Sequence, residues 1–314
     1  MLLQDARDSQ ILFLSLFLVL GIGTRDWTLR PDLILVVFVT CWVTQWIAVF
    51  LLPSFKINIL NLLTRQQNCS QEIDFDWANP VKWLSLKSAT ITALGLSLLL
   101  RSDSYTTMVL AASLAILSKF LFQVNHKHFF NPANFGIISV LILTKDAWVS
   151  PGQWGDDWWY ALLFVGTGGM VLKQVGRWDT TAAFLGSYAL LEAIRNLWLG
   201  WTWDVYCHRL MSGSLLLFAL FMITDPRSIP NARFSRIFWA ISIGVLTFIL
   251  RNQFFVSTAV FWALFALAPL SILLDFLWSA PRFSWLKQSQ LSLETQSLIE
   301  IAALESVHVP NPEF

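Results

Sequence analysis

Apolar runs bounded by charged residues or by Pro, Gly or Asn follow one another along the chain. An α-helix needs about 20 mostly apolar residues to cross the hydrocarbon core of a bilayer. The pattern predicts an all-α integral membrane protein of about ten transmembrane helices. The expected spans are Ile11–Gly23, Leu33–Leu52, Leu86–Leu100, Thr106–Val124, Asn131–Thr144, Trp158–Leu172, Thr180–Gly200, Leu210–Thr224, Ser235–Leu250 and Phe254–Leu277. The first, third, fifth and eighth are short, so re-entrant or broken helices are alternatives there, and the fifth can either cross or re-enter.

Composition supports a chain surrounded by lipid. Only 13% of the residues are charged and 56% are hydrophobic, whereas soluble domains carry about 25% charged residues. The net charge of +1 and the scattered Lys and Arg residues give no indication of nucleic-acid binding. Cys41, Cys69 and Cys207 form no C-x-x-C motif, so we expect no metal site.

The expected organisation is a transmembrane domain at residues 1–278, with halves at about 1–145 and 146–278, and a cytoplasmic tail at 279–314. Lys and Arg are more frequent on the side that carries both termini and the polar loop 53–85. Positive residues concentrate in cytoplasmic loops, so both termini are predicted to lie inside. Five spans in each half would turn the second half upside down relative to the first, as in inverted repeats.

A first polar motif, Lys127–Gly136, interrupts the apolar sequence before the fifth span. Asn131 and Pro132 are residue types that begin a helix, and Asn134 follows within its first turn. The motif closes at Gly136. One interpretation is a helix cap and turn. The other is a site for a polar ligand or another subunit at a helix N-terminus, where the helix dipole favours anions.

A second motif begins at Ser212 and Gly213 and ends at Thr224 and Asp225, before a proline. Small residues allow a helix or ligand to approach closely, and Asp before Pro ends a helix. Asp225 is therefore either an ordinary turn residue or part of a site.

Charged side chains inside spans are costly and often functional. Lys119 lies late in the fourth span, where extension of its ammonium group to the membrane surface is the simpler explanation. Glu192 and Arg195 are three residues apart, and we expect them to pair on one helix face.

Both motifs, in this order and after Lys119, resemble the NqrB/RnfD family, the membrane subunits of bacterial sodium-pumping NADH:quinone reductase and Rnf electron-transport complexes. The segment Gly244–Arg251 is also similar to the family. The resemblance implies a ten-helix bundle of two inverted five-helix repeats, related to urea transporters, in the bacterial inner membrane beside other membrane subunits. In this interpretation the chain is at most one subunit of an oxidoreductase complex.

The family also implies a flavin. Typical members attach flavin mononucleotide (FMN) to a Thr in a long loop between the fifth and sixth spans. Here that loop, Lys145–Asp157, contains no Thr, so we expect no covalent FMN. The resemblance leaves noncovalent FMN or riboflavin, with Lys119, Asn131, Pro132, Asn134, Gly136, Ser212, Gly213, Thr224 and Asp225 as candidate binding residues. The alternatives are a transporter for a flavin or another small polar solute, and an accessory membrane protein without a cofactor.

Overall fold

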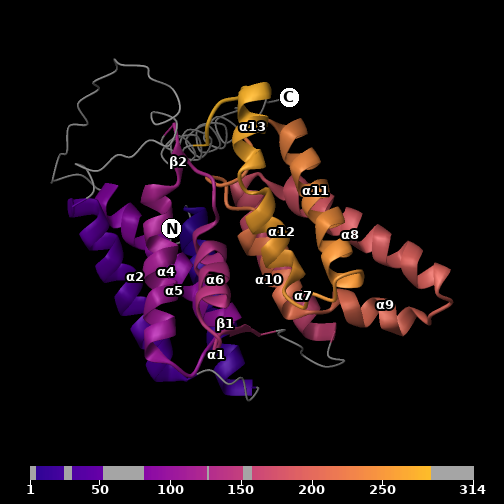
Figure 1. Cartoon of the computed structure of the whole chain (residues 1–314), viewed down its shortest axis with the longest axis horizontal. Coiled ribbons are helices and arrows are strands. Elements are labelled where there is room, and N and C mark those ends of the chain that lie inside the picture. The colour runs from indigo at the N-terminus through magenta and orange to yellow at the C-terminus, as the bar shows by residue number, and fades with distance from the viewer. Residues whose placement is uncertain (1–4, 25–29, 52–80, 126, 151–157, 284–314) are drawn as a thin grey trace, which may run out of the picture.

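The computed structural model describes residues 5–24, 30–51, 81–125, 127–150 and 158–283, and these are mostly helical. Figure 1 shows the helices side by side, with the first half of the chain on the left and the second half on the right. The helices of the first half are α1 (Ala6–Thr24), α2 (Pro31–Leu51), α4 (Val81–Leu99), α5 (Tyr105–Leu121) and α6 (Pro132–Leu143). The second half has α7 (Trp158–Val175), α8 (Trp178–Trp198), α9 (Trp203–Leu210), α10 (Gly213–Leu217), the π-helix η2 (Phe218–Met222), α11 (Arg233–Asn252), α12 (Ala259–Leu267) and α13 (Leu270–Leu277).

Some of these helices are long enough to span a membrane. Among the described residues, the helices α1, α2 and α11 are long and apolar enough to cross a bilayer, and α12 with α13 would form a fourth span bent by 45°. Each of the other predicted spans coincides with a helix, but several of these helices are shorter. An all-α membrane protein is therefore supported, while ten crossings and the inverted repeat stay predictions.

The outward faces of the helices are apolar. On α2, Leu35 and Trp46 are more than half exposed, and on α7 and α8 so are Trp159 and Leu190. A water-soluble protein rarely exposes apolar side chains in such numbers along its helices. These faces fit contact with lipid chains or with other apolar helices.

Helix pairs within each half pack side by side. In the first half α1 packs along α4, α2 along α5, and α5 along α6; in the second half α7 packs along α10 and η2, α8 along α11, and α11 along α12. Glycine permits the closest of these approaches. A Cβ atom on Gly136 would lie 2.6 Å from the carbonyl oxygen of Ala111 on α5, and one on Gly244 would lie 3.1 Å from that of Phe184 on α8.

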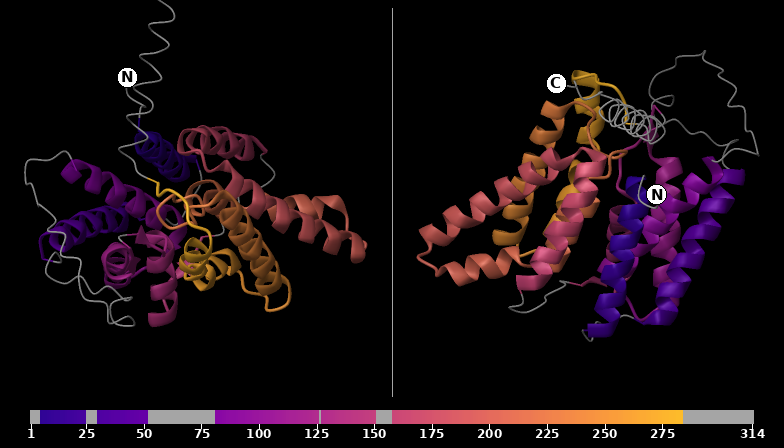
Figure 2. Two further views of the ribbon diagram at one scale, coloured as in Figure 1. Left: turned by 90° about the horizontal axis from the view of Figure 1, so that it is seen from above. Right: turned by 180° about the vertical axis from the view of Figure 1, so that it is seen from behind.

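The two halves meet through α1 with α7 and through α6 with α12. Phe17 of α1 stacks on Phe164 of α7 with ring centroids 4.0 Å apart. Phe130, just before α6, stacks on Phe265 of α12 at 5.0 Å. Both views in Figure 2 show the first and second halves in contact along the middle of the molecule.

Two short antiparallel ladders complete the described fold. The strand β1 (Leu100–Arg101) pairs with β4 (Trp148–Val149), and β2 (Gln123–Val124) pairs with β3 (Lys127–His128). The second ladder forms the hairpin that leads from α5 into α6, and it sets the position of the first polar motif.

Several predicted boundaries were wrong. The helix α4 begins at Val81, so the last five residues of the predicted loop 53–85 are helical; residues 53–80 and 284–314 lie outside the described part. Leu210 belongs to α9, which occupies a segment expected to be a loop, and the eighth helical segment begins only at Gly213. The last segment is interrupted at Ala268 and Pro269, because proline lacks the N–H that continues a helix.

Candidate functional site

The short helix pair α10 and η2 ends inside the molecule, and side chains complete its hydrogen bonds. The π-helical bond from Ile223 N to Phe218 O is 2.9 Å long, and helix ends leave carbonyl groups without helical partners. Four consecutive carbonyls instead accept side-chain hydrogen bonds. The donors are Thr181 Oγ1 to Ala219 O (2.6 Å), Thr224 Oγ1 to Leu220 O (3.1 Å), Gln10 Nε2 to Phe221 O (3.3 Å) and Asn131 Nδ2 to Met222 O (3.0 Å).

The start of α6 faces this helix end. Asn131 is the N-cap of α6, and its Oδ1 accepts from Asn134 N at 3.1 Å, with Pro132 in the first helical position. Asn134 donates from Nδ2 to the Phe261 carbonyl of α12 at 3.1 Å. Its Oδ1 is buried and has no hydrogen-bond partner within the described residues. The cap interpretation of this motif is therefore correct, and both amides also join the two halves.

A cavity of about 100 Å³ lies between the two motifs. It is bounded by α1, α4, α7, α10 and η2, by the residues around the start of α6, and by the loop after η2. Its polar lining residues come from both halves of the chain: Arg7, Gln10, Ser88, Thr92, His128, Asn131, Thr224, Asp225 and Arg227.

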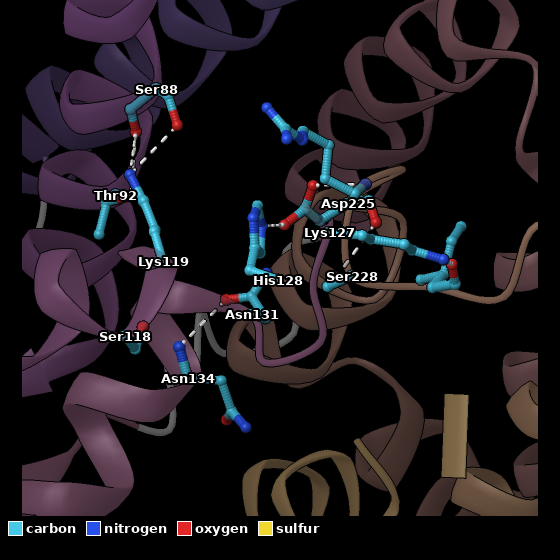
Figure 3. A network of polar contacts seen from close by, with 12 residues as sticks. Ser88, Thr92, Ser118, Lys119, Lys127, His128, Asn131, Asn134, Asp225 and Ser228 are labelled. Carbon is cyan, nitrogen blue, oxygen red and sulfur yellow. Dashed lines mark hydrogen bonds and ion pairs between the residues drawn. The ribbon is translucent and has the colours of Figure 1, made fainter. Parts of the chain in front are cut away.

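Lys119 is held next to this cavity. The side chain is buried, and its Nζ donates to the carbonyl and the hydroxyl of Ser88 at 3.2 and 3.1 Å. Figure 3 shows Lys119 and Ser88 on one side and His128 with Asp225 on the other. The predicted extension of Lys119 to the membrane surface was wrong, because Ser88 on the neighbouring helix α4 satisfies the ammonium group inside the protein.

His128 and Asp225 form the other polar side of the cavity, His128 at the end of the strand β3 and Asp225 in the loop after η2. His128 Nε2 lies 3.4 Å from Asp225 Oδ2, and Arg227 N donates to Asp225 Oδ1 at 3.1 Å. Burial lowers the pKa of His128 below its ordinary value, against the opposing effect of the Asp225 carboxylate. Burial works to raise the pKa of Asp225, but the contacts with His128 and Arg227 outweigh it and keep that pKa below its ordinary value. The site therefore presents a neutral imidazole beside a carboxylate at neutral pH.

The predicted site residues divide into three groups. Four of them line the cavity: Asn131, Pro132, Thr224 and Asp225. Lys119 does not line it but donates a hydrogen bond to Ser88, which does. Asn134 and Gly136 lie deeper in α6, where Gly136 makes room for α5. Ser212 and Gly213 lie at the opposite end of the α10–η2 pair and do not line the cavity.

Several residues that line the cavity were not predicted from the sequence. Arg7 and Gln10 come from α1, and Ser88 and Thr92 come from α4. They belong to no motif, so the apolar periodicity of these helices gave no signal for them. His128 stood within the first motif, although no role was expected for it.

The expected Glu192–Arg195 pair was wrong. Glu192 is buried and accepts from Arg209 NH1 at 3.0 Å and from Asn252 Nδ2 at 2.7 Å. The guanidinium carbon of Arg195 instead lies 4.7 Å from the centre of the Trp201 ring. The pair failed because α9 and α11 bring in partners that are distant in sequence.

Comparison with known proteins adds to this geometry. Residues 147–280, from β4 to just beyond α13, match the model of the NQR2, RnfD, RnfE family. This part of the chain is similar to the NQR2, RnfD, RnfE family. It includes the Asp225 motif, and it confirms the resemblance that the motifs indicated. The Asn131 motif lies outside the matched residues.

Two bacterial relatives are each named as a subunit of an ion-translocating oxidoreductase complex. The protein from Actinobacillus pleuropneumoniae serotype 5b (strain L20) is 29% identical over 102 residues, which is 32% of this chain and 29% of the relative. The protein from Vibrio vulnificus (strain YJ016) is 35% identical over 101 residues, which is 31% of this chain and 28% of the relative. The matched region thus spans less than a third of the length of these curated relatives.

Proposed function

We propose that this family member is a membrane subunit of an ion-translocating oxidoreductase complex and works beside other membrane subunits. The observation that carries the proposal is the family match over residues 147–280, together with two relatives named as subunits of such a complex. The apolar outer faces of α2, α7 and α8 offer surfaces for lipid and for neighbouring membrane helices.

The cavity between the motifs is the proposed place for a noncovalent flavin. Its polar lining suits the phosphate and the ribityl hydroxyls, because Arg227 and Arg7, the latter already paired with Asp5 at 2.7 Å, carry guanidinium N–H groups, while Ser88 and Thr92 carry hydroxyl groups. Its volume of about 100 Å³ is below the roughly 300–1,000 Å³ of pockets that enclose larger ligands. The phosphate and ribityl end thus fits the lining, whereas the flavin ring system does not fit within the cavity as it stands. A flavin supplies one- and two-electron chemistry when bound; no electron-transfer step is assigned to these residues.

A small polar solute is the second candidate ligand, and the size of the cavity favours it. A volume of about 100 Å³ accommodates a few waters or a compact molecule. A transporter for such a solute would use the same lining without any redox group.

The test begins with the absorption spectrum of the detergent-purified full chain, and of the supernatant and pellet after acid precipitation. Flavin in the supernatant supports the noncovalent site, and flavin in the pellet would contradict the expectation that no covalent attachment exists. Absence of flavin from both fractions refutes the flavin part of the proposal and directs the work to solute uptake in vesicles. Co-purification of other membrane subunits from native membranes, identified by mass spectrometry, tests the subunit proposal separately.

Two matched variants connect a bound flavin to the cavity. Thr92 and Thr90 lie on α4 and make the same bond, each donating its hydroxyl to the carbonyl four residues earlier at 2.9 Å. Thr92 lines the cavity, whereas Thr90 accepts from Trp42 Nε1 of α2 at 3.0 Å. We expect Thr92→Leu to reduce flavin content severalfold and Thr90→Leu to leave it unchanged. Equal retention in both variants would place any flavin elsewhere.

A further inference from the structure

The helix α9 lies outside the bundle at the end where α8 and α11 finish. In Figure 1 it runs across the direction of α4 and α11. It has no buried residue. A short helix that crosses the others at one end of a membrane protein is placed as interfacial helices are, in the plane of the lipid headgroups.

The turn before α9 is held firmly. Gly200 adopts a φ of +66°, which favours glycine, and Asn196 Nδ2 donates to the carbonyls of Trp201 and Thr202 at 3.1 and 3.2 Å. Arg209 at the other end of α9 donates to the Glu192 carboxylate. These contacts fix Trp201 and Arg209 relative to the C-terminal part of α8.

Two guanidinium groups flank the Trp201 ring. The guanidinium carbons of Arg195 and Arg209 lie 4.7 and 5.4 Å from the ring centre. Glu192 is within hydrogen-bonding distance of Arg209, but no carboxylate in the described part of the chain pairs with Arg195. Arg251 nearby donates to the neutral hydroxyl of Tyr188 at 3.0 Å. The patch formed by Arg195, Trp201 and Arg209 therefore carries excess positive charge.

Two exposed tryptophans lie close to these residues in the sequence, at the end of α8 and at the start of α9. Trp198 is 88% exposed and Trp203 is 55% exposed. Trp concentrates at the membrane–water interface, since its apolar ring and its N–H group prefer different surroundings. The patch thus combines positive charge with the side chains of an interfacial belt.

We propose that Arg195, Trp201 and Arg209 form a site for the phosphate of an anionic phospholipid. The guanidinium group of Arg195 is planar, and its N–H groups match phosphate oxygens in pairs. The adjacent rings would contact the glycerol and the upper acyl chain, while α9 lies at headgroup depth. This site is separate from the central cavity and does not depend on a flavin being bound there.

The test measures lipid retention by native mass spectrometry of the full chain. Delipidated protein in detergent is titrated with an equimolar mixture of phosphatidylglycerol and phosphatidylcholine that have the same acyl chains. We expect the wild type to retain phosphatidylglycerol preferentially. A basic side chain near an anionic membrane surface contributes about a fivefold gain in binding, so Arg195→Gln should lower phosphatidylglycerol affinity by about that factor. Arg195→Lys should keep part of it, because the charge stays and the planar group is lost.

Arg30→Gln is the matched control. Arg30 is half exposed and already pairs with Asp32 at 2.6 Å, so its loss should leave lipid preference unchanged. Thermal unfolding of each variant verifies the fold. The proposal is overturned if the wild type retains both lipids equally, or if folded Arg195→Gln retains phosphatidylglycerol as the wild type does. Preferential capture of an acidic protein segment, with no lipid preference, would also overturn it.

Discussion

Replacement of Asn131 tests how the two polar motifs stabilise each other. The residue makes two bonds at once: its Oδ1 caps α6 by accepting from Asn134 N, and its Nδ2 donates to the carbonyl of Met222. Loss of an N-cap costs about 1 kcal/mol. Loss of the donor to a buried carbonyl costs roughly 1–3 kcal/mol, at the lower end here because Asp225 N also donates to Met222 O at 3.3 Å. Asn131→Ala should therefore lower the free energy of unfolding by about 2–3 kcal/mol.

Asn131→Ser separates the two contributions. Serine is as good an N-cap as asparagine, but it is too short to replace the bond to Met222. We expect it to cost about 1 kcal/mol, which is half or less of the alanine effect. The assay is denaturant unfolding of the purified chain in micelles, with Gln253→Ala at an exposed position as the control. The reasoning is refuted if serine and alanine are equally destabilising, or if both variants unfold like the wild type.

Three further predictions concern other contacts. Gly136→Val should weaken the α5–α6 packing by roughly 1–3 kcal/mol, because its Cβ would meet the Ala111 carbonyl, and a lower thermal midpoint checks this. Asp179 and Arg236 form a buried ion pair at 2.7 Å. Asp179→Asn or Arg236→Gln alone should lower the free energy of unfolding by about 3–5 kcal/mol. In a denaturant titration, the double variant should lose less stability than the two single variants added together. The Ser102 hydroxyl, helped by Thr107, lowers the pKa of Asp146 below 3.8. The ionised Asp146 carboxylate therefore stabilises the fold fully above about pH 3.8, and this stabilisation is lost as the pH falls through the lowered pKa. Asp146→Asn should therefore flatten the acid limb of a curve of unfolding free energy against pH.

The apolar runs predicted most of the helices, because lipid-facing and core-facing surfaces are both apolar and leave long uninterrupted runs. The pattern failed where a helix is amphipathic. The helix α9 carries Asp204, His208 and Arg209, so hydropathy alone assigned it to a loop. The start of α4 was missed for a similar reason, since Lys82 and Lys87 lie in its first two turns.

Predictions about individual side chains depended on whether their partners are local. The Asn131 cap was predictable because the N–H that donates to its Oδ1 belongs to Asn134, three residues away. Lys119 and Glu192 were assigned by local geometry, but Ser88 is 31 residues from the first, and Asn252 is 60 from the second. Only the folded arrangement of helices brings such partners together, so no spacing rule could have identified them.

The hydrogen bonds at the end of η2 limit which candidate residues can still bind a ligand. An unsatisfied backbone carbonyl within a bilayer costs several kcal/mol, so the side chains of Gln10 and Asn131 that donate to Phe221 O and Met222 O are costly to divert. The Thr224 hydroxyl likewise already donates its proton to Leu220 O.

His128 and Asp225, on the other side of the cavity, can still form hydrogen bonds with a ligand. Asp225 is partly exposed, and its carboxylate has more acceptor positions than the bonds from His128 and Arg227 occupy. His128 uses only one ring nitrogen in its contact with Asp225. Donor groups of a bound ligand, such as hydroxyls, would therefore contact His128 and Asp225, while Asn131 acts by joining the start of α6 to the end of η2. It follows that Asp225→Asn should change ligand affinity with little loss of stability, whereas Asn131→Ala should reduce both together; equal behaviour of the two variants in binding and unfolding measurements would contradict this division of roles.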